Sequence, residues 1–208
     1  MRTGRPREFD VERTLDRAVR VFWRQGYEGT AIADLTEALG INRPSLYAAF
    51  GNKESLFRQV LARYVEQRAN YLPLALARPS ARAVVEQLLL GAADATTGRG
   101  LPRGCLGVQG ALATSPDSDP VRRTLTGWRR SGEAGIRARL ARAREEGDLP
   151  AAVDPAVLAR YVCSLMYGMS VQAAGGATRT QLHQVVELSL AGWDALLAGE
   201  QSPEIPPG

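Results

Sequence analysis

The segment from residue 26 to residue 57 constrains the fold of this chain more than any other. Between Ile32 and Leu39 the apolar residues recur at the spacing of one helical face, and Thr30 precedes them as a candidate N-cap. Gly40 follows, and glycine at this place lets a chain turn in the left-handed region at the end of a helix. The pattern predicts a short helix that ends in a tight turn.

A second short helix is predicted immediately after this turn. Asn42 is its candidate N-cap, and Pro44 lies in its first turn, where a missing backbone N–H costs no hydrogen bond. The helix covers residues 43–50, and Asn52 then caps a third helix that begins at Lys53. Two short helices joined by a glycine turn form a helix-turn-helix, which lays its second helix in the major groove of DNA.

Helical patterns continue through most of the remaining chain, without a strand pattern or a repeat. We expect an all-α fold of about nine helices, in which a three-helix helix-turn-helix DNA-binding domain precedes a larger helical regulatory and dimerisation domain. The expected domains are a DNA-binding domain with a basic N-terminal arm (1–52), a helical ligand-binding and dimerisation domain (53–200) and a disordered tail (201–208). Outside the helix-turn-helix, helices are expected at about 10–25, 53–72, 81–96, 105–116, 119–146, 155–174 and 180–197.

Charge and cysteine content narrow the classes of function. The net charge of +4 permits nucleic-acid binding, and no apolar run is long enough to span a membrane. The charged N-terminus lacks the apolar core of a secretory signal, so we expect a cytoplasmic protein. Cys105 and Cys163 have no metal-ligand spacing and His183 is the only histidine, so we expect no metal, no cofactor and no enzymatic activity.

The helix-turn-helix residues also carry a family resemblance. Over roughly its first quarter, the chain resembles the DNA-binding domain of the tetracycline repressor (TetR) family. The matching positions are Leu15 to Ala18, Phe22 to Tyr27, Thr30, Leu35, Ala38, Gly40, Ile41, Leu46, Tyr47, Phe50, Lys53 and Glu54. The resemblance implies a ligand-responsive transcriptional regulator that binds a palindromic operator as a homodimer and is released by a small-molecule effector. Repression is the default expectation, because a compact dimer on a promoter blocks polymerase by occupancy.

Exposed residues at the start of the second short helix are the candidates for reading bases. The Arg43 guanidinium can donate a forked pair of hydrogen bonds to guanine, and Pro44 or Ser45 can contact a thymine methyl or a base edge. Ahead of the first helix, Arg5 and Arg7 form a basic arm that can lie in an AT-rich minor groove. The alternative for this arm is a frayed, solvated terminus.

Phosphate contacts are implied by the family resemblance. Thr30, Tyr47 and Lys53 lie at positions that resemble the family's phosphate contacts, and the helix N-terminus at Lys53 adds its amide N–H groups. The full expected DNA-binding set is Arg5, Arg7, Thr30, Ala31, Arg43, Pro44, Ser45, Tyr47 and Lys53.

Two helices near the C-terminus are apolar on most of their sides, so most of their surface must be buried. Both can be ordinary core helices, or one face of each can pack against a second copy of the chain. The family resemblance favours the second interpretation, in which the helices and their symmetry mates form a four-helix dimer interface. The residues expected at that interface are Leu158, Val162, Met166, Leu182, Val186, Trp193 and Leu197.

A small-molecule pocket in the regulatory domain is also implied by the resemblance. Trp128 is the strongest candidate, because an indole can stack on a flat ligand. The residues expected to line the pocket are Tyr64, Arg68, Cys105, Leu106, Gln109, Leu125, Trp128, Arg129, Tyr161, Leu165 and Met169. Two alternatives are a thiol redox-sensing regulator that uses Cys105 and Cys163, and an architectural DNA-binding protein without a ligand.

Overall fold

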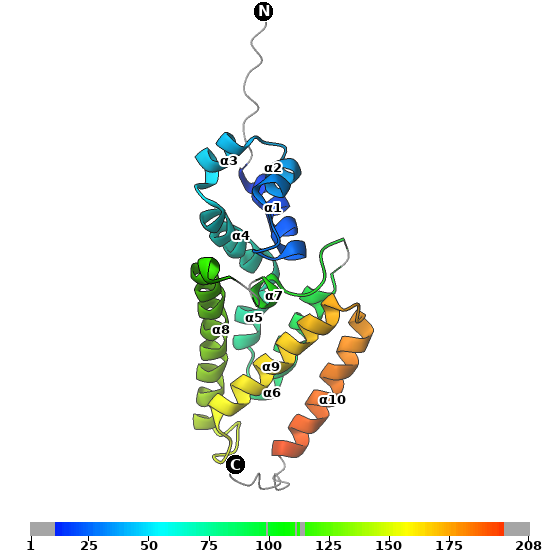
Figure 1. The fold of residues 1–208 in the computed structure, drawn as a ribbon. Coiled ribbons are helices and arrows are strands. Elements are labelled where there is room, and N and C mark those ends of the chain that lie inside the picture. The colour runs from blue at the N-terminus through cyan, green and yellow to red at the C-terminus, as the bar shows by residue number, and fades with distance from the viewer. Residues whose placement is uncertain (1–10, 99, 111, 113–114, 198–208) are drawn as a thin grey trace, which may run out of the picture.

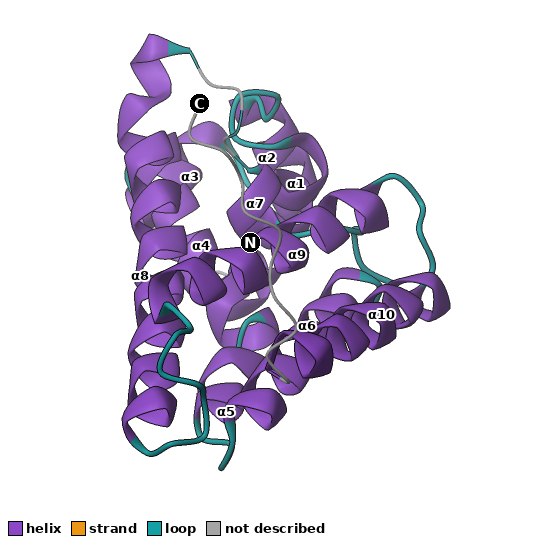
Figure 2. Ribbon diagram, turned by 90° about the horizontal axis from the view of Figure 1, so that it is seen from below, coloured by secondary structure: helices purple, strands orange, loops and turns teal. Residues whose placement is uncertain are grey.

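The computed structural model describes residues 11–98, 100–110, 112 and 115–197. All regular secondary structure in this described part is helical, which confirms the predicted fold class (Figure 2). The helices are α1 (Val11–Gln25), α2 (Ile32–Leu39), α3 (Arg43–Phe50), α4 (Lys53–Arg68), α5 (Tyr71–Leu76), α6 (Ala81–Thr96), α7 (Leu106–Gln109), α8 (Asp119–Glu145), α9 (Pro155–Ala174) and α10 (Arg179–Leu197), with a 3-10 turn at Pro116–Ser118.

Two helices are shorter than the sequence pattern predicts. The expected helix 53–72 ends at Arg68, and α5 begins at Tyr71 as a separate helix. Pro73 explains the break, because in a continuous helix its ring would clash with the carbonyl of Ala69 and its missing N–H would leave that carbonyl unpaired. The expected helix 105–116 is reduced to the single turn α7, in a segment weakened by two glycines.

The N-terminal core contains α1 to α4 and continues beyond them. The Phe22 and Phe57 rings meet edge to face with centroids 5.1 Å apart, and Trp23 meets Tyr64 at 4.9 Å. Leu125 of α8 is buried in the same cluster. The packing therefore does not divide at residue 52, because most of α4 completes the core under the helix-turn-helix. In Figure 1 these helices form one end of the molecule, with α3 farthest from α10.

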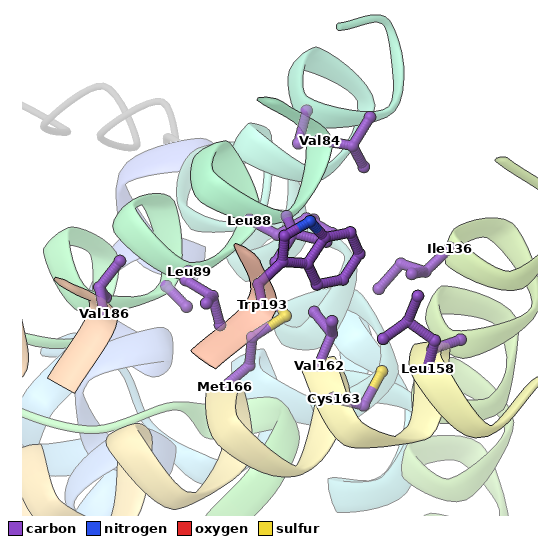
Figure 3. Packing of buried hydrophobic residues seen from close by; sticks show 14 of the residues in the cluster. Val84, Leu88, Leu89, Ile136, Leu158, Val162, Cys163, Met166, Val186 and Trp193 are labelled. Carbon is purple, nitrogen blue, oxygen red and sulfur yellow. The ribbon is translucent and has the colours of Figure 1, made fainter. Parts of the chain in front are cut away.

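A second core joins α6, α8, α9 and α10. Figure 3 shows Val162 and Met166 of α9 pointing toward Trp193 of α10 and Leu88 of α6. The interior position of these side chains corrects the predicted dimer contacts. Six of the expected residues are at most 9% exposed within a single chain: Leu158, Val162, Met166, Leu182, Val186 and Trp193. The side chain of Leu197 lies outside the described part.

The opposite faces of α9 and α10 carry exposed apolar residues. On α9 these are Val157, Tyr161 and Val171, which recur at helical spacing, and on α10 they are Val185 and Leu188. Leu188 is 76% exposed and Val157 is 65% exposed. We call these five residues the α9–α10 apolar face. The sequence pattern indicated correctly that these helices are apolar on two sides, but it did not distinguish the inner side from the outer one.

Candidate nucleic-acid interface and internal cavity

The turn between α2 and α3 depends on Gly40. Its φ of 69° lies in the left-handed region, where a side chain is strained. Its N–H donates to the carbonyl of Thr36 at 3.0 Å, and the N–H of Ile41 donates to the same carbonyl at 3.2 Å. These bonds close the C-terminus of α2 and direct the chain into α3, as the sequence predicts.

The start of α2 differs from the prediction. Ala31, rather than Thr30, occupies the N-cap position, and the carboxylate of Asp34 accepts from its N–H at 2.9 Å. The Thr30 hydroxyl instead donates to the carbonyl of Gly26 at 2.6 Å. Thr30 is 0% exposed, so its side chain is not accessible to a DNA phosphate, and that expected contact is corrected.

Helix α3 is held in place by its two ends and by its inner face. The Asn42 side chain accepts from the N–H of Ser45 at 2.9 Å, which makes it the predicted N-cap. Leu46 and Phe50 are buried in the N-terminal core. Because these residues anchor the inner face, the remaining side chains of the helix point away from the protein.

The outer face of α3 presents the expected base-reading residues. Arg43, Pro44 and Ser45 are exposed in its first turn, and Tyr47 is exposed one turn later. The Arg43 Nε donates to the Tyr47 hydroxyl at 3.2 Å, and its guanidinium carbon lies 5.4 Å from the centroid of the same ring. Arg5 and Arg7 lie outside the described residues.

Lys53 is placed beside this face at the N-terminus of α4. Its Nζ lies 4.4 Å from the ring centroid of Tyr27, which is close enough for a cation–π contact. Burial of the ammonium lowers the pKa of Lys53, and the charges of Glu28 and Asp34 oppose that shift. Asn52 caps the helix by accepting from the N–H of Ser55 at 2.8 Å.

Helix α7 connects the N-terminal helices to the rest of the molecule (Figure 1). The N–H of Tyr27 donates to the carbonyl of Gly110, which follows α7, at 2.9 Å. On the other side, the Arg129 guanidinium of α8 donates to the carbonyl of Gly107 in α7 at 2.8 Å. A Cβ at Gly107 would lie 2.2 Å from the Trp128 ring, so glycine is required for this close approach.

An internal cavity of about 340 Å³ lies among α4, α5, α6, α8 and α9. Five of the expected lining residues border it: Tyr64, Arg68, Cys105, Trp128 and Arg129. Residues that the prediction missed include Tyr71, Thr96, Cys163, Tyr167 and Ser170, together with Met166, which was expected at the dimer interface. A cavity of this size can hold a small organic molecule.

Three expected pocket residues are buried elsewhere. Leu106 and Leu125 belong to the N-terminal core, and Met169 belongs to the larger core. Apolar periodicity identified these side chains as internal, but it does not separate a close-packed interior position from one that borders a cavity.

The other three expected pocket residues also lie outside the cavity lining. Tyr161 is exposed on the outer face of α9, and Leu165 packs against the larger core. The Gln109 Oε1 accepts from the N–H of Cys105 at 3.0 Å, so its amide supports the loop before α7. A local role of this kind has no sequence signature.

One of the cavity residues that the prediction missed, Tyr71, is indicated indirectly by a glycine in the sequence. Gly91 lies in the middle of α6, and a Cβ there would meet the Tyr71 ring at 2.7 Å. A glycine inside a helix often marks a close approach by a neighbouring group. Here that neighbour is a tyrosine that lines the cavity.

Burial raises the pKa of both cysteine thiols above its ordinary value. Burial raises the pKa of Cys105, although the Tyr64 hydroxyl beside it opposes the shift. Burial also raises the pKa of Cys163 to about 11. Because the thiolate is the reactive form, these environments disfavour the redox-sensing alternative.

The described part of the chain contains neither a candidate metal site nor a candidate membrane-spanning helix. No group of three or more His, Cys, Asp or Glu side chains there could hold a metal ion. His183 Nε2 lies 2.8 Å from the Asp94 carboxylate, in an ion-pair cluster with Arg179 that joins α10 to α6. Of the helices described, none has the length and apolar character needed to cross a membrane.

Comparison with known proteins agrees with this geometry. Residues 15–60 match the family model described as bacterial regulatory proteins, tetR family, and residues 81–188 match the tetracyclin repressor-like C-terminal domain. The HTH-type transcriptional repressor ComR of Escherichia coli (strain K12) is 34% identical over 196 residues, which cover 93% of each chain. The chain belongs to the tetR family. It is therefore a transcription regulator and not an enzyme.

Other relatives of this tetR-family regulator include a second repressor and two solved structures. The HTH-type transcriptional repressor BdcR of the same E. coli strain is 38% identical over 122 residues, covering 57% of this chain and 60% of BdcR. A cysteine mutant of the TetR family regulator CifR, solved with 26-bp operator DNA, is 44% identical with a TM-score of 0.86, covering 91% of this chain and 100% of CifR. A TetR regulator from Rhodococcus sp. RHA1 is 44% identical with a TM-score of 0.60, covering 86% and 96%.

Proposed function

We propose that this tetR-family regulator represses transcription by binding a palindromic operator as a homodimer, and that a small molecule in the cavity releases it. The observation that carries the proposal is the exposed first turn of α3, which buried Leu46 and Phe50 hold in a helix-turn-helix. This chain is 44% identical to CifR, which was solved with operator DNA, and that identity supports the same use of the α3 surface.

Arg43 is the proposed base-reading residue. In this structure its guanidinium rests against Tyr47, which orients it along the outer face of α3. On DNA the guanidinium would donate to guanine O6 and N7, with Pro44 and Ser45 against neighbouring base edges. The Tyr47 hydroxyl would then be free to donate to a phosphate.

Contacts to the DNA backbone would flank the first turn of α3, which is proposed to read the bases. Lys53 and the exposed N-terminus of α2, which follows Ala31, are the proposed phosphate contacts, since helix N-termini present N–H donors. The N–H of Ala31 itself already donates to Asp34, so the donors of α2 would be those of its first turn. The basic arm with Arg5 and Arg7 is proposed to lie in the adjacent minor groove.

A homodimer is proposed through the α9–α10 apolar face. Exposed Ser164 and Gly168 lie between Tyr161 and Val171 on α9, so the face combines apolar residues with small ones that allow close helix approach. Several large exposed apolar side chains on one pair of helices favour burial against a partner. A two-fold dimer would place two α3 helices about 34–36 Å apart, which requires a palindromic site.

Effector release is proposed to act through α7. Trp128 and Arg129 line the cavity and contact Gly107, while the carbonyl of Gly110 accepts from Tyr27. A ligand that repositions α8 side chains would therefore move a segment hydrogen-bonded to the DNA-binding helices. In this scheme the ligand favours a conformer of the dimer in which the separation of the two α3 helices does not match the spacing of the operator half-sites.

The first test is selection of bound sequences from random double-stranded DNA at a stated salt concentration. We expect a palindromic motif for the unchanged protein. Arg43→Ala should relax one base position in each half-site, and it should weaken binding by about 1–3 kcal/mol in each half-site because the forked hydrogen bond to guanine is removed.

Arg142→Ala is the matched control, because Arg142 is exposed near the C-terminus of α8, a region remote from α3. It should leave both the motif and the affinity unchanged. Weak, salt-sensitive binding without a motif would contradict sequence-specific operator binding.

A further inference from the structure

The charged side chains that line the cavity are all cationic. They are Arg68 and Arg129, and the lining contains no aspartate or glutamate. Arg129 donates to the Gly107 carbonyl at 2.8 Å and to the Thr126 hydroxyl at 3.3 Å, and both acceptors are uncharged. The guanidinium group has five N–H donors, so these two bonds leave donors available to a ligand.

The Glu133 carboxylate is the nearby negative charge on α8: besides burial, it contributes to the raised pKa of Cys163 and Tyr167 in the cavity wall. Glu133 is one turn from Arg129 on α8, but it does not line the cavity and it pairs with Arg160 at 3.3 Å. Within the described residues, neither Arg68 nor Arg129 forms an ion pair. Half-buried cations that form no ion pair make the cavity favourable for an anion.

The remaining wall is aromatic and aliphatic. Trp128, Tyr64, Tyr71 and Tyr167 supply flat ring surfaces, and the hydroxyls of the tyrosines are additional neutral donors. Burial raises the pKa of all three phenols, so they carry no competing negative charge. The volume of about 340 Å³ is near the lower end of the usual range for ligand sites.

We propose that the cavity binds a small amphipathic carboxylate, with the carboxylate on the Arg129 guanidinium and a flat apolar body against Trp128. The assignment of this ligand class rests on the effector function proposed above. A carboxylate accepts two parallel hydrogen bonds from a guanidinium and competes with neutral acceptors for its donors. Its binding would therefore loosen the bond between Arg129 and Gly107 that now holds α7.

The test compares three ligands with one body and different charge. Binding of 3-phenylpropanoate, 3-phenylpropanamide and 3-phenylpropylamine to the full chain, without DNA, is measured by calorimetry. The carboxylate should bind at least about tenfold more tightly than the amide, and the amine should bind most weakly. Octanoate and indole-3-acetate extend the series to other bodies with the same head group.

Matched arginine variants locate the contact. Arg129→Gln keeps a hydrogen-bond donor but removes the charge. The ratio of carboxylate affinity to amide affinity should therefore fall to about one, while amide binding persists. Arg68→Gln should reduce the preference partially. Arg130→Gln is the control, because Arg130 is exposed on the same helix and does not line the cavity.

The outcomes separate the ligand class from the effector function. Amide or amine binding as tight as carboxylate binding, a preference unchanged in Arg129→Gln, or no binding by any of the three carboxylates overturns the ligand class. Operator release is then measured separately. Carboxylate binding with the expected preference but without operator release supports the ligand class and contradicts the effector function. Operator release by neutral ligands alone supports the effector function and contradicts the ligand class.

Discussion

At the scale of single residues, neighbouring positions of one motif have opposite environments. Thr30 and Lys53 both resemble phosphate contacts, yet the Thr30 hydroxyl is buried on the Gly26 carbonyl while the Lys53 ammonium lies over the Tyr27 ring beside α3. Arg43 is exposed and oriented by Tyr47. Side-chain accessibility, rather than position in the motif, therefore decides which of these residues can contact DNA.

Lys53→Ala tests the phosphate contact. We expect operator affinity to fall by a similar factor for all sequences, because a phosphate contact carries no base information. The slope of log K against log salt should decrease by about one for each half-site. Lys53→Arg should retain most of the slope, and a changed sequence preference at unchanged slope would contradict the assignment. Thermal unfolding of both variants checks whether removal of the Tyr27 contact destabilises the fold.

At the scale of elements, glycine and proline determine where the helices end. Gly40 closes α2 in the left-handed region, and Pro73 separates α5 from α4. The short α5 brings Tyr71 against Gly91 and into the cavity wall. A continuous helix would have carried Tyr71 along the axis of α4 instead, so this local break helps to form the ligand site.

Gly40→Ala should destabilise the protein by about 1–2 kcal/mol, because alanine is strained at a φ of 69°. Gly127→Ala is the matched comparison. Gly127 lies inside α8 with nothing within 4 Å of its would-be Cβ, so alanine should stabilise the protein by about 0.5–1 kcal/mol. Urea unfolding midpoints at constant m-value measure both changes. Equal effects of the two substitutions would contradict the role of the left-handed turn.

At the scale of the whole molecule, α9 and α10 have an inner and an outer apolar side. The inner side, with Val162 and Trp193, completes the chain's own core (Figure 3). The outer side, with Val157 and Leu188, has no covering element among the residues described. A dimer built on the outer side would leave α3 of each chain free to contact DNA, because α3 lies at the other end of the molecule (Figure 1).

Leu188→Asp should therefore shift the protein from dimer to monomer, because the interface would bury an unpaired charge. Operator affinity should fall with dimerisation, while the helical content of the monomer stays unchanged. Leu74→Asp is the control, because Leu74 is 63% exposed on α5, away from the proposed interface. Analytical ultracentrifugation measures the shift. A Leu188→Asp variant that remains dimeric would exclude this face.

The sequence alone determined the features that depend on near neighbours along the chain. The Gly40 turn, the Asn42 and Asn52 caps and the starts of the helices near residues 119 and 155 were predictable, because capping and backbone preferences act over a few residues. Family resemblance then made the outer face of α3 predictable as the DNA-binding surface. The tetR-family assignment confirmed the resemblance itself, and the DNA-binding role of this face stays a prediction.

Only the tertiary structure decided which apolar residues form the core, the cavity wall and the outer face. Val162 and Tyr161 are adjacent on α9, yet one is buried in the core and the other is exposed. Tyr71 and Tyr167 meet at the cavity from helices far apart in the sequence. Periodicity identifies the apolar sides of a helix, but the partner that covers each side depends on how distant helices pack.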